Sequence, residues 1–153
     1  MLVIAALAAW LLFNRPDQLP SRVLAVAGSK DTIMKVGQVG GACPSQRCLT
    51  IYVAPWCPSC RAMEPTINAL GHQLEAEGMT VRLVVGSDTM SAVREYARKF
   101  DRRVLLDPDG AYFNESGLRG VPYFAVTDAD GRILEARYGG RTTVAGMREF
   151  LDL

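Results

Sequence analysis

Two cysteines separated by two residues, Cys57 and Cys60, are the residues of this chain best suited to chemistry. They follow the apolar run 49–54 and precede a segment whose apolar residues have helical spacing, which places them where a strand passes into a helix. The N–H groups and partial positive charge at a helix N-terminus stabilise a thiolate and lower its pKa. We therefore expect Cys57 to be an exposed nucleophile and Cys60, one turn further on, to be a more buried resolving thiol.

The elements that position these cysteines alternate between strand and helix. Gly78 is expected to end the first helix, and Ser87 or Asp88 to cap the second. The β-α-β order implies parallel strands, and a turn at Asp130-Gly131 adds an antiparallel hairpin, so we predict an α/β fold with a mixed sheet flanked by helices. The expected strands are 23–27, 32–36, 49–54, 81–85, 123–128 and 132–138, with a short apolar piece at 104–106; a loop is expected at 37–45, a turn at 107–110, and helices at 58–77, 88–100, 112–118 and 143–151.

Three further features accompany the cysteine pair. Trp56 precedes it, Pro65 lies inside the following helix, and Val121-Pro122 opens a downstream apolar strand. This set resembles the thioredoxin superfamily, in which a W-C-x-x-C motif starts the first helix, a proline kinks that helix, and a cis-proline lies against the active disulfide. The resemblance covers residues 49–153. The segments 104–110 and 120–131 look most like the membrane-anchored TlpA-like branch.

The resemblance implies roles for the residues that match the motif. Cys57 and Cys60 would be catalytic, and Pro122 would be a cis-proline. A cis bond would turn the Val121 backbone toward the dithiol, where its N–H and C=O can pair with an extended substrate peptide. The alternative is a trans proline at a strand edge, since cis is the minority form of X-Pro bonds.

Three more residues belong to the expected active-site loop. Trp56 is expected to shield the site and to offer a flat apolar surface to a partner; the alternative is plain packing. Pro58 and Ser59 fill the dipeptide that helps to set the redox potential in this superfamily, and Pro58 rigidifies the turn.

One position departs from the superfamily pattern. Thioredoxins carry a buried acidic residue six positions before the first cysteine, where this chain has Ile51. Glu64, one turn after Cys60, is the nearest acid in the helix. Resolution of a mixed disulfide is therefore expected to be slower, or to rely on another base or on water.

A second cysteine pair, Cys43 and Cys48, flanks a short turn before the expected catalytic strand. One interpretation is a structural disulfide that pins this loop, and another is a second redox pair that exchanges with Cys57–Cys60. A third is that all four cysteines bind zinc or another metal. We expect no metal and no cofactor.

Length and charge set broader limits. The chain has 153 residues, enough for one domain with a core, and a formal net charge of +1. This balance gives no reason to expect a nucleic-acid partner. No dimerisation domain precedes residue 49, so we expect a monomer.

The N-terminal residues suggest a cellular location. Residues 1–13 are apolar and uncharged, which we interpret as a membrane anchor or export signal, followed by a linker at 14–22 and a thioredoxin-like domain at 23–153 with its core at 49–153. The alternative is an ordinary buried helix. Four cysteines in an exported chain suit an oxidising space, so we expect the periplasm or cell envelope.

Together these features predict a cell-envelope thiol–disulfide oxidoreductase that acts as a reductant on exported proteins containing cysteines. A membrane thiol-reductant transporter is the expected electron source. The alternatives are a thiol oxidant or disulfide isomerase of the same fold, and a four-cysteine metallochaperone.

Overall fold

The centre of the fold is strand β3, whose residues from Cys48 to Val53 are all buried. The computed structural model describes residues 17–28 and 36–153, and in these ranges it confirms the predicted α/β class with a mixed sheet. The strands are β1 (Arg22–Val26), β2 (Val36–Val39), β3 (Arg47–Val53), β4 (Thr80–Gly86), β5 (Val104–Asp107), β6 (Tyr123–Asp128) and β7 (Ile133–Tyr138). The helices are α2 (Pro58–Ala62), α3 (Glu64–Ala76), α4 (Met90–Ala97), α5 (Ala111–Glu115) and α6 (Val144–Phe150).

The seven strands form one sheet in the order β2-β1-β5-β4-β3-β6-β7. Strands β3, β4 and β5 are parallel, whereas β6 pairs antiparallel with β3, and β7 antiparallel with β6. The β1–β2 hairpin extends the sheet beyond β5 through an antiparallel β1–β5 pair. All the parallel strands therefore end at the same edge of the sheet, and α2 begins at that edge directly after β3.

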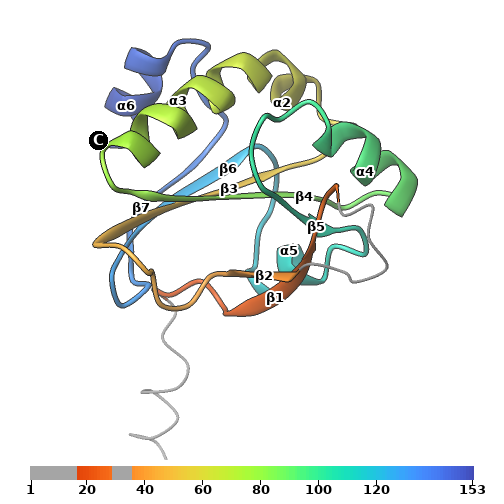
Figure 1. Ribbon diagram of the computed structural model, residues 1–153, viewed down its shortest axis with the longest axis horizontal. Helices are drawn as coiled ribbons and strands as arrows, with labels where there is room; N and C mark the ends of the chain where they lie inside the picture. The colour runs from red at the N-terminus through yellow and green to blue at the C-terminus, as the bar shows by residue number, and fades with distance from the viewer. Residues whose placement is uncertain (1–16, 29–35) are drawn as a thin grey trace, which may run out of the picture.

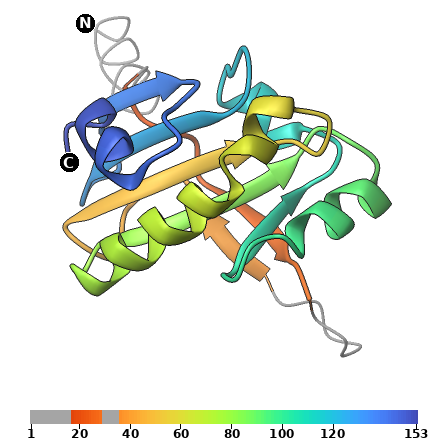
Figure 2. The same ribbon diagram turned by 90° about the horizontal axis from the view of Figure 1, so that it is seen from above.

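Helices cover both faces of the sheet, unequally. Figure 1 shows α2, α3, α4 and α6 above the central strands and α5 below them, next to the β1–β2 hairpin. Seen from above in Figure 2, α3 lies between α6 and α4. Two apolar clusters match these layers: one contains Ile67, Leu70 and Leu74 of α3, and the other contains Tyr52 and Tyr112. The active-site helix is thus anchored by the larger cluster.

The predicted helix at 58–77 is interrupted. It ends as α2 at Ala62 and restarts as α3 at Glu64, with Met63 between them at φ −97° and ψ 0°. Pro65 lacks the N–H that would bond the carbonyl four residues earlier, and its ring crowds that carbonyl. The interruption leaves Cys57 and Cys60 on a short helix of their own.

Two other expectations are corrected. The second helix is capped by Thr89, whose hydroxyl accepts from the N–H of Ala92 at 3.3 Å, rather than by Ser87 or Asp88. The loop expected at 37–45 is partly strand, since β2 covers Val36–Val39 and its pairing with β1 satisfies the backbone there. Most of the strand expected at 32–36 lies outside the described residues.

The described part of the expected linker packs against the domain. Leu19 is buried, Gln18 bridges to Arg132, and the carbonyl of Asp17 accepts from the N–H of Ile133 at 2.7 Å. The apolar segment 1–13 lies outside the described residues. Among the helices of residues 17–28 and 36–153, none has the length and hydrophobicity of a membrane span.

Candidate functional site: a disulfide at a helix N-terminus

Cys57 is the N-cap of α2. Its backbone is extended, and its Sγ accepts a hydrogen bond from the N–H of Cys60 at 3.1 Å. Pro58 occupies the first helical position, where a missing N–H costs nothing. The sulfur therefore occupies the place where an N-cap oxygen usually stands, facing the positive end of the helix.

The two cysteines form a disulfide with a Cα–Cα distance of 5.3 Å. Cys60 is fully buried, as expected, but Cys57 is only 2% exposed, so the expectation of an exposed nucleophile is wrong for this oxidised state. Neighbouring chain covers Cys57: the Ser59 hydroxyl lies 3.4 Å from its Sγ, and the Val121 carbonyl lies 3.7 Å from it. Little of Cys57 is therefore accessible to a partner in this oxidised state.

The Val121–Pro122 bond is cis, and it adjoins the disulfide. The sheet brings it there, because Tyr52 at the end of β3 pairs with Tyr123 at the start of β6. The peptide before Tyr123 must then lie beside the turn that leads into α2. On the other side, the Pro122 carbonyl accepts from the N–H of Gly139 at 2.9 Å.

Trp56 is 55% exposed and is held by one hydrogen bond. Its indole Nε1–H donates to the Ser87 carbonyl at 2.8 Å. Ser87 follows β4 with φ 58°, a left-handed conformation that is unusual for serine. The ring also lines a cavity of about 380 Å³ together with Pro55, Arg61 and other residues of α3 and α4. The exposed ring therefore offers an apolar surface one residue before Cys57, next to a cavity with several charged residues.

A buried carboxylate supports that turn. Asp107 is 1% exposed and accepts from the hydroxyl of Tyr52 at 2.8 Å and from the N–H of Tyr112 at 3.0 Å. The Tyr52 hydroxyl lies 3.1 Å from the Ser87 hydroxyl, and the N–H of Ser87 donates to the Asp107 carbonyl. Burial, more than the neighbouring charge, raises the pKa of Tyr52. From its sequence context Asp107 is expected only in a turn, and its position directly after an apolar run is the one signal of burial.

The acid that thioredoxins place beneath the dithiol has no counterpart here. Ile51 is fully buried within β3. Glu64 faces α4 and lines the same cavity as Trp56; its charge adds to burial in raising the pKa of Tyr96. The position of the thioredoxin acid is therefore apolar here, and the partner shown for Glu64 is Tyr96 of α4.

Cys43 and Cys48 form the second disulfide, with a Cα–Cα distance of 5.8 Å. Cys48 lies near the start of β3, whereas Cys57 follows its end, so the two disulfides are at opposite ends of this strand. Direct exchange between them within one molecule is not possible in this arrangement. The four-cysteine metal site is not formed either, since each pair is bonded, and no group of three or more ligands gathers within 17–28 and 36–153.

Comparison with known proteins gives relatives for most of the chain. The profile of the Redoxin family matches residues 43–151. A thiol:disulfide interchange protein DsbE homolog of Paracoccus denitrificans is 28% identical over 141 residues, which cover 88% of this chain and 78% of that protein. The thiol-disulfide oxidoreductase ResA of Bacillus thuringiensis is 24% identical over 89 residues, or 57% of this chain and 51% of ResA.

Solved structures show the same fold. The exposed lipoprotein thioredoxin Etrx1 of Streptococcus pneumoniae has a TM-score of 0.66 at 18% identity, with 87% of this chain and 98% of that chain covered. StoA of Bacillus subtilis has a TM-score of 0.62 at 18% identity, with 88% and 98% covered. At these identities the likeness concerns the fold alone.

Proposed function

Since this chain belongs to the Redoxin family and is a thiol–disulfide oxidoreductase, we propose that Cys57 and Cys60 are its reacting pair and that it works as a reductant. The observation that carries the assignment is the position of Cys57 Sγ at the N-terminus of α2, where the N–H of Cys60 donates to it. After reduction, the same N–H and the helix dipole stabilise a thiolate at that atom.

The exchange proceeds in two displacements. The Cys57 thiolate attacks one sulfur of a substrate disulfide; an S–S bond forms to Cys57, and the other substrate sulfur leaves as a thiolate. The Cys60 thiolate then attacks Cys57 Sγ, which forms the Cys57–Cys60 disulfide and releases the second substrate sulfur. Two electrons pass to the substrate, and the enzyme ends in the oxidised state that the structure describes.

The groups around the disulfide have supporting roles in this proposal. The Val121 carbonyl, 3.7 Å from Cys57 Sγ, marks where an extended substrate backbone pairs beside the cis-Pro122 bond. Trp56 supplies the apolar surface next to it. Pro58 and Ser59 shape the turn between the sulfurs, and Cys43–Cys48 serves as a structural disulfide.

We also propose the cell envelope as the site of action. The names of the DsbE and ResA relatives support disulfide chemistry, and the apolar residues 1–13 support an anchor or export signal. The substrates would be exported proteins with cysteines. A membrane thiol-reductant transporter would reduce the Cys57–Cys60 disulfide again after each cycle. The protein would act as a monomer.

The assignment is tested by serine substitutions in the reduced protein. Cys57→Ser is expected to lower the rate of insulin disulfide reduction at least about 100-fold, because a hydroxyl replaces the thiolate nucleophile. Cys60→Ser is expected to accumulate a mixed disulfide through Cys57, visible as an added mass that dithiothreitol removes. A matched Cys43→Ser/Cys48→Ser protein keeps its activity. Trapping at Cys43 or Cys48 instead would overturn the assignment.

Direction is tested separately by the equilibrium reduction potential of the Cys57–Cys60 pair. A reductant is expected near the thioredoxin value of about −270 mV. A potential near the DsbA value of about −120 mV would show an oxidant and would overturn the proposed direction while leaving the reacting pair in place.

A further inference from the structure

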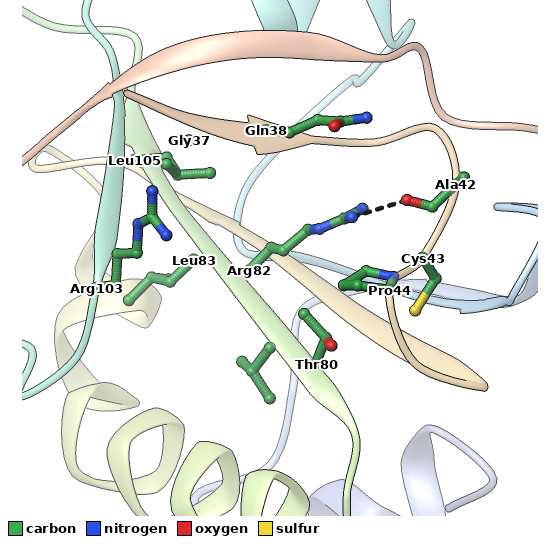
Figure 3. A pocket seen from close by; sticks show the side chains of 11 residues that line it. Gly37, Gln38, Ala42, Cys43, Pro44, Thr80, Arg82, Leu83, Arg103 and Leu105 are labelled. Atoms are coloured by element: carbon green, nitrogen blue, oxygen red, sulfur yellow. Dashed lines mark hydrogen bonds between the residues drawn. The ribbon is translucent and has the colours of Figure 1, made fainter. Parts of the chain in front are cut away.

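A cavity at the opposite edge of the sheet from Cys57–Cys60 has no part in this exchange. It has a volume of about 370 Å³ and lies between β2, the first half of β4, and the loop that leads to Cys43 (Figure 3). Its lining includes Gln38, Thr80, Arg82 and Arg103. It is therefore a separate place on the molecule with its own polar groups.

Arg82 is the unusual group in this cavity. Its side chain projects from β4 across the cavity, and the residue is only 9% exposed. Its two terminal nitrogens donate to the carbonyls of Gly40 at 3.0 Å and Ala42 at 2.9 Å. A guanidinium has five N–H donors, and these two hydrogen bonds use two of them.

Among the described residues, no carboxylate is paired with the charge of Arg82. Within residues 17–28 and 36–153, Arg82 forms no ion pair, and both of its hydrogen-bond acceptors are neutral. Burial lowers the pKa of Arg82, as expected where desolvation of a cation is not offset by an anion. Buried charges in proteins are normally paired, so an unpaired one beside an empty volume indicates a place for an anion.

The rest of the lining restricts the shape of that anion. Arg103 places a second guanidinium along the wall of the cavity, and the Thr80 hydroxyl lies at the end of the cavity nearest Cys43. Leu83, Leu105 and Pro44 make the remaining wall apolar. The cavity is larger than a single phosphate or carboxylate needs, so a short apolar part fits beside the charged group.

We propose that this cavity is a binding site for a small organic anion, in which Arg82 pairs with a carboxylate or phosphate group and the apolar wall holds a short carbon chain. Guanidinium groups suit both oxyanions, because their planar fork can donate two parallel hydrogen bonds. The site is independent of thiol–disulfide exchange and sits at the other edge of the sheet.

A purely structural role for Arg82 makes a different prediction. If Arg82 only holds the carbonyls of Gly40 and Ala42 in place, its replacement changes stability, and no anion binds to the wild-type protein. The two cases are separated by titration of the oxidised, folded protein.

The test is a titration followed by backbone amide NMR, with inorganic phosphate and with butyrate as separate probes, at constant ionic strength set by sodium chloride. Saturable shifts are expected at amides of 37–44 and 80–83, with a dissociation constant in the millimolar range or below. Phosphate alone, butyrate alone, or both will show which oxyanion the site prefers.

Two variants and a control complete the test. Arg82→Gln is expected to weaken binding at least tenfold, and Arg82→Lys, which keeps the charge but not the fork, by less. Arg98→Gln, which removes an exposed cation at the C-cap of α4 that does not line the cavity, is the control and keeps wild-type binding. The lysine variant keeps the test valid if the glutamine variant does not fold. No saturable shift, or equal binding by wild type and both Arg82 variants, would overturn the proposal.

Discussion

At the scale of single residues, neutral groups surround the Cys57 sulfur. Its closest partners are the N–H of Cys60, the hydroxyl of Ser59 and the carbonyl of Val121. Ile51, which stands where thioredoxins carry an acid, adds no negative charge beneath the pair that would oppose the formation of a thiolate. The pKa of the reduced Cys57 is therefore expected to depend mainly on the helix terminus and on these short contacts.

Ser59→Ala tests one of these contacts. The hydroxyl lies 3.4 Å from Cys57 Sγ and can donate to the thiolate after reduction. Its loss removes a hydrogen bond to the charged form, which raises the pKa of Cys57. The pH dependence of alkylation by iodoacetamide measures this. Ser91→Ala is the matched control, and equal pKa values in all three proteins would contradict the prediction.

Single residues also show which parts of the site the sequence can predict. Cys57 and Cys60 stand in a motif whose chemistry depends on spacing, so the chain itself points to them, whereas the role of Pro122 was implied by the resemblance to thioredoxins. The roles of Ser87 and Asp107 cannot be predicted in this way, because they depend on the register of the strands. Parallel pairing places Gly86 opposite Asp107, and the hydroxyl of Tyr52 then contacts the side chains of Ser87 and Asp107. Asp107 begins the stretch Asp-Pro-Asp-Gly, whose composition is typical of an exposed turn and therefore does not indicate a buried hydrogen-bond acceptor.

At the scale of elements, the turn after β4 positions the tryptophan. Ser87 has φ 58°, and its carbonyl accepts from Trp56. Ser87→Gly keeps that conformation freely, whereas Ser87→Val must leave it or lose about 1–2 kcal/mol of stability. We expect the valine variant to be less stable and its Trp56 more mobile, and the glycine variant to remain close to wild type.

Fluorescence anisotropy of Trp56 in a Trp10→Phe background, combined with urea unfolding, measures both effects. If the valine and glycine variants behave alike, the left-handed turn does not position Trp56.

The disulfide of Cys43 and Cys48 gives another prediction for an element. It fastens the loop whose Gly40 and Ala42 carbonyls accept from Arg82, and the N–H of Cys43 donates to Ala129. For so short a loop, the chain-entropy relation gives about 2 kcal/mol of stabilisation. Cys43→Ser/Cys48→Ser, with the other pair oxidised, is expected to lose that amount in urea unfolding. An unchanged midpoint would show that hydrogen bonds alone hold the loop.

Elements were predicted well where apolar spacing is clear and less well at their ends. The apolar positions of α3 and the run of β3 are buried as expected. The break at Met63 and the cap at Thr89 were missed, because Ser87, Asp88 and Thr89 are all good capping residues and only tertiary contacts select among them. Strand β2 was missed because Gly37 and Gly40 resemble a loop.

At the scale of the whole molecule, four buried tyrosines govern behaviour in alkali. Burial is the main cause that raises the pKa of Tyr52, Tyr96 and Tyr112 above the ordinary value, and that of Tyr123 to about 12. Above a pH of about 10 the unfolded chain releases these protons and the folded chain retains them. Stability therefore falls as pH rises through that range, by up to about 1.4 kcal/mol per pH unit for each such group.

The expected outcome is that tyrosinate absorbance from these side chains appears together with loss of the near-ultraviolet circular dichroism of the fold. Tyr123→Phe is expected to reduce the slope of the unfolding free energy against pH by the contribution of one tyrosine, up to about 1.4 kcal/mol per pH unit. Titration of all four tyrosines while the dichroism stays native would contradict the prediction.

The placement of the two disulfides at opposite ends of β3 determines how the rate of electron transfer between them depends on protein concentration. Five residue steps of extended chain separate Cys48 from Val53, or about 17 Å, which no sulfur crosses within one molecule. Any transfer of electrons between the Cys43–Cys48 and Cys57–Cys60 pairs must then be second order in protein, and dilution slows it in proportion. At low protein concentration, each pair would keep its own redox state for as long as the molecules seldom meet.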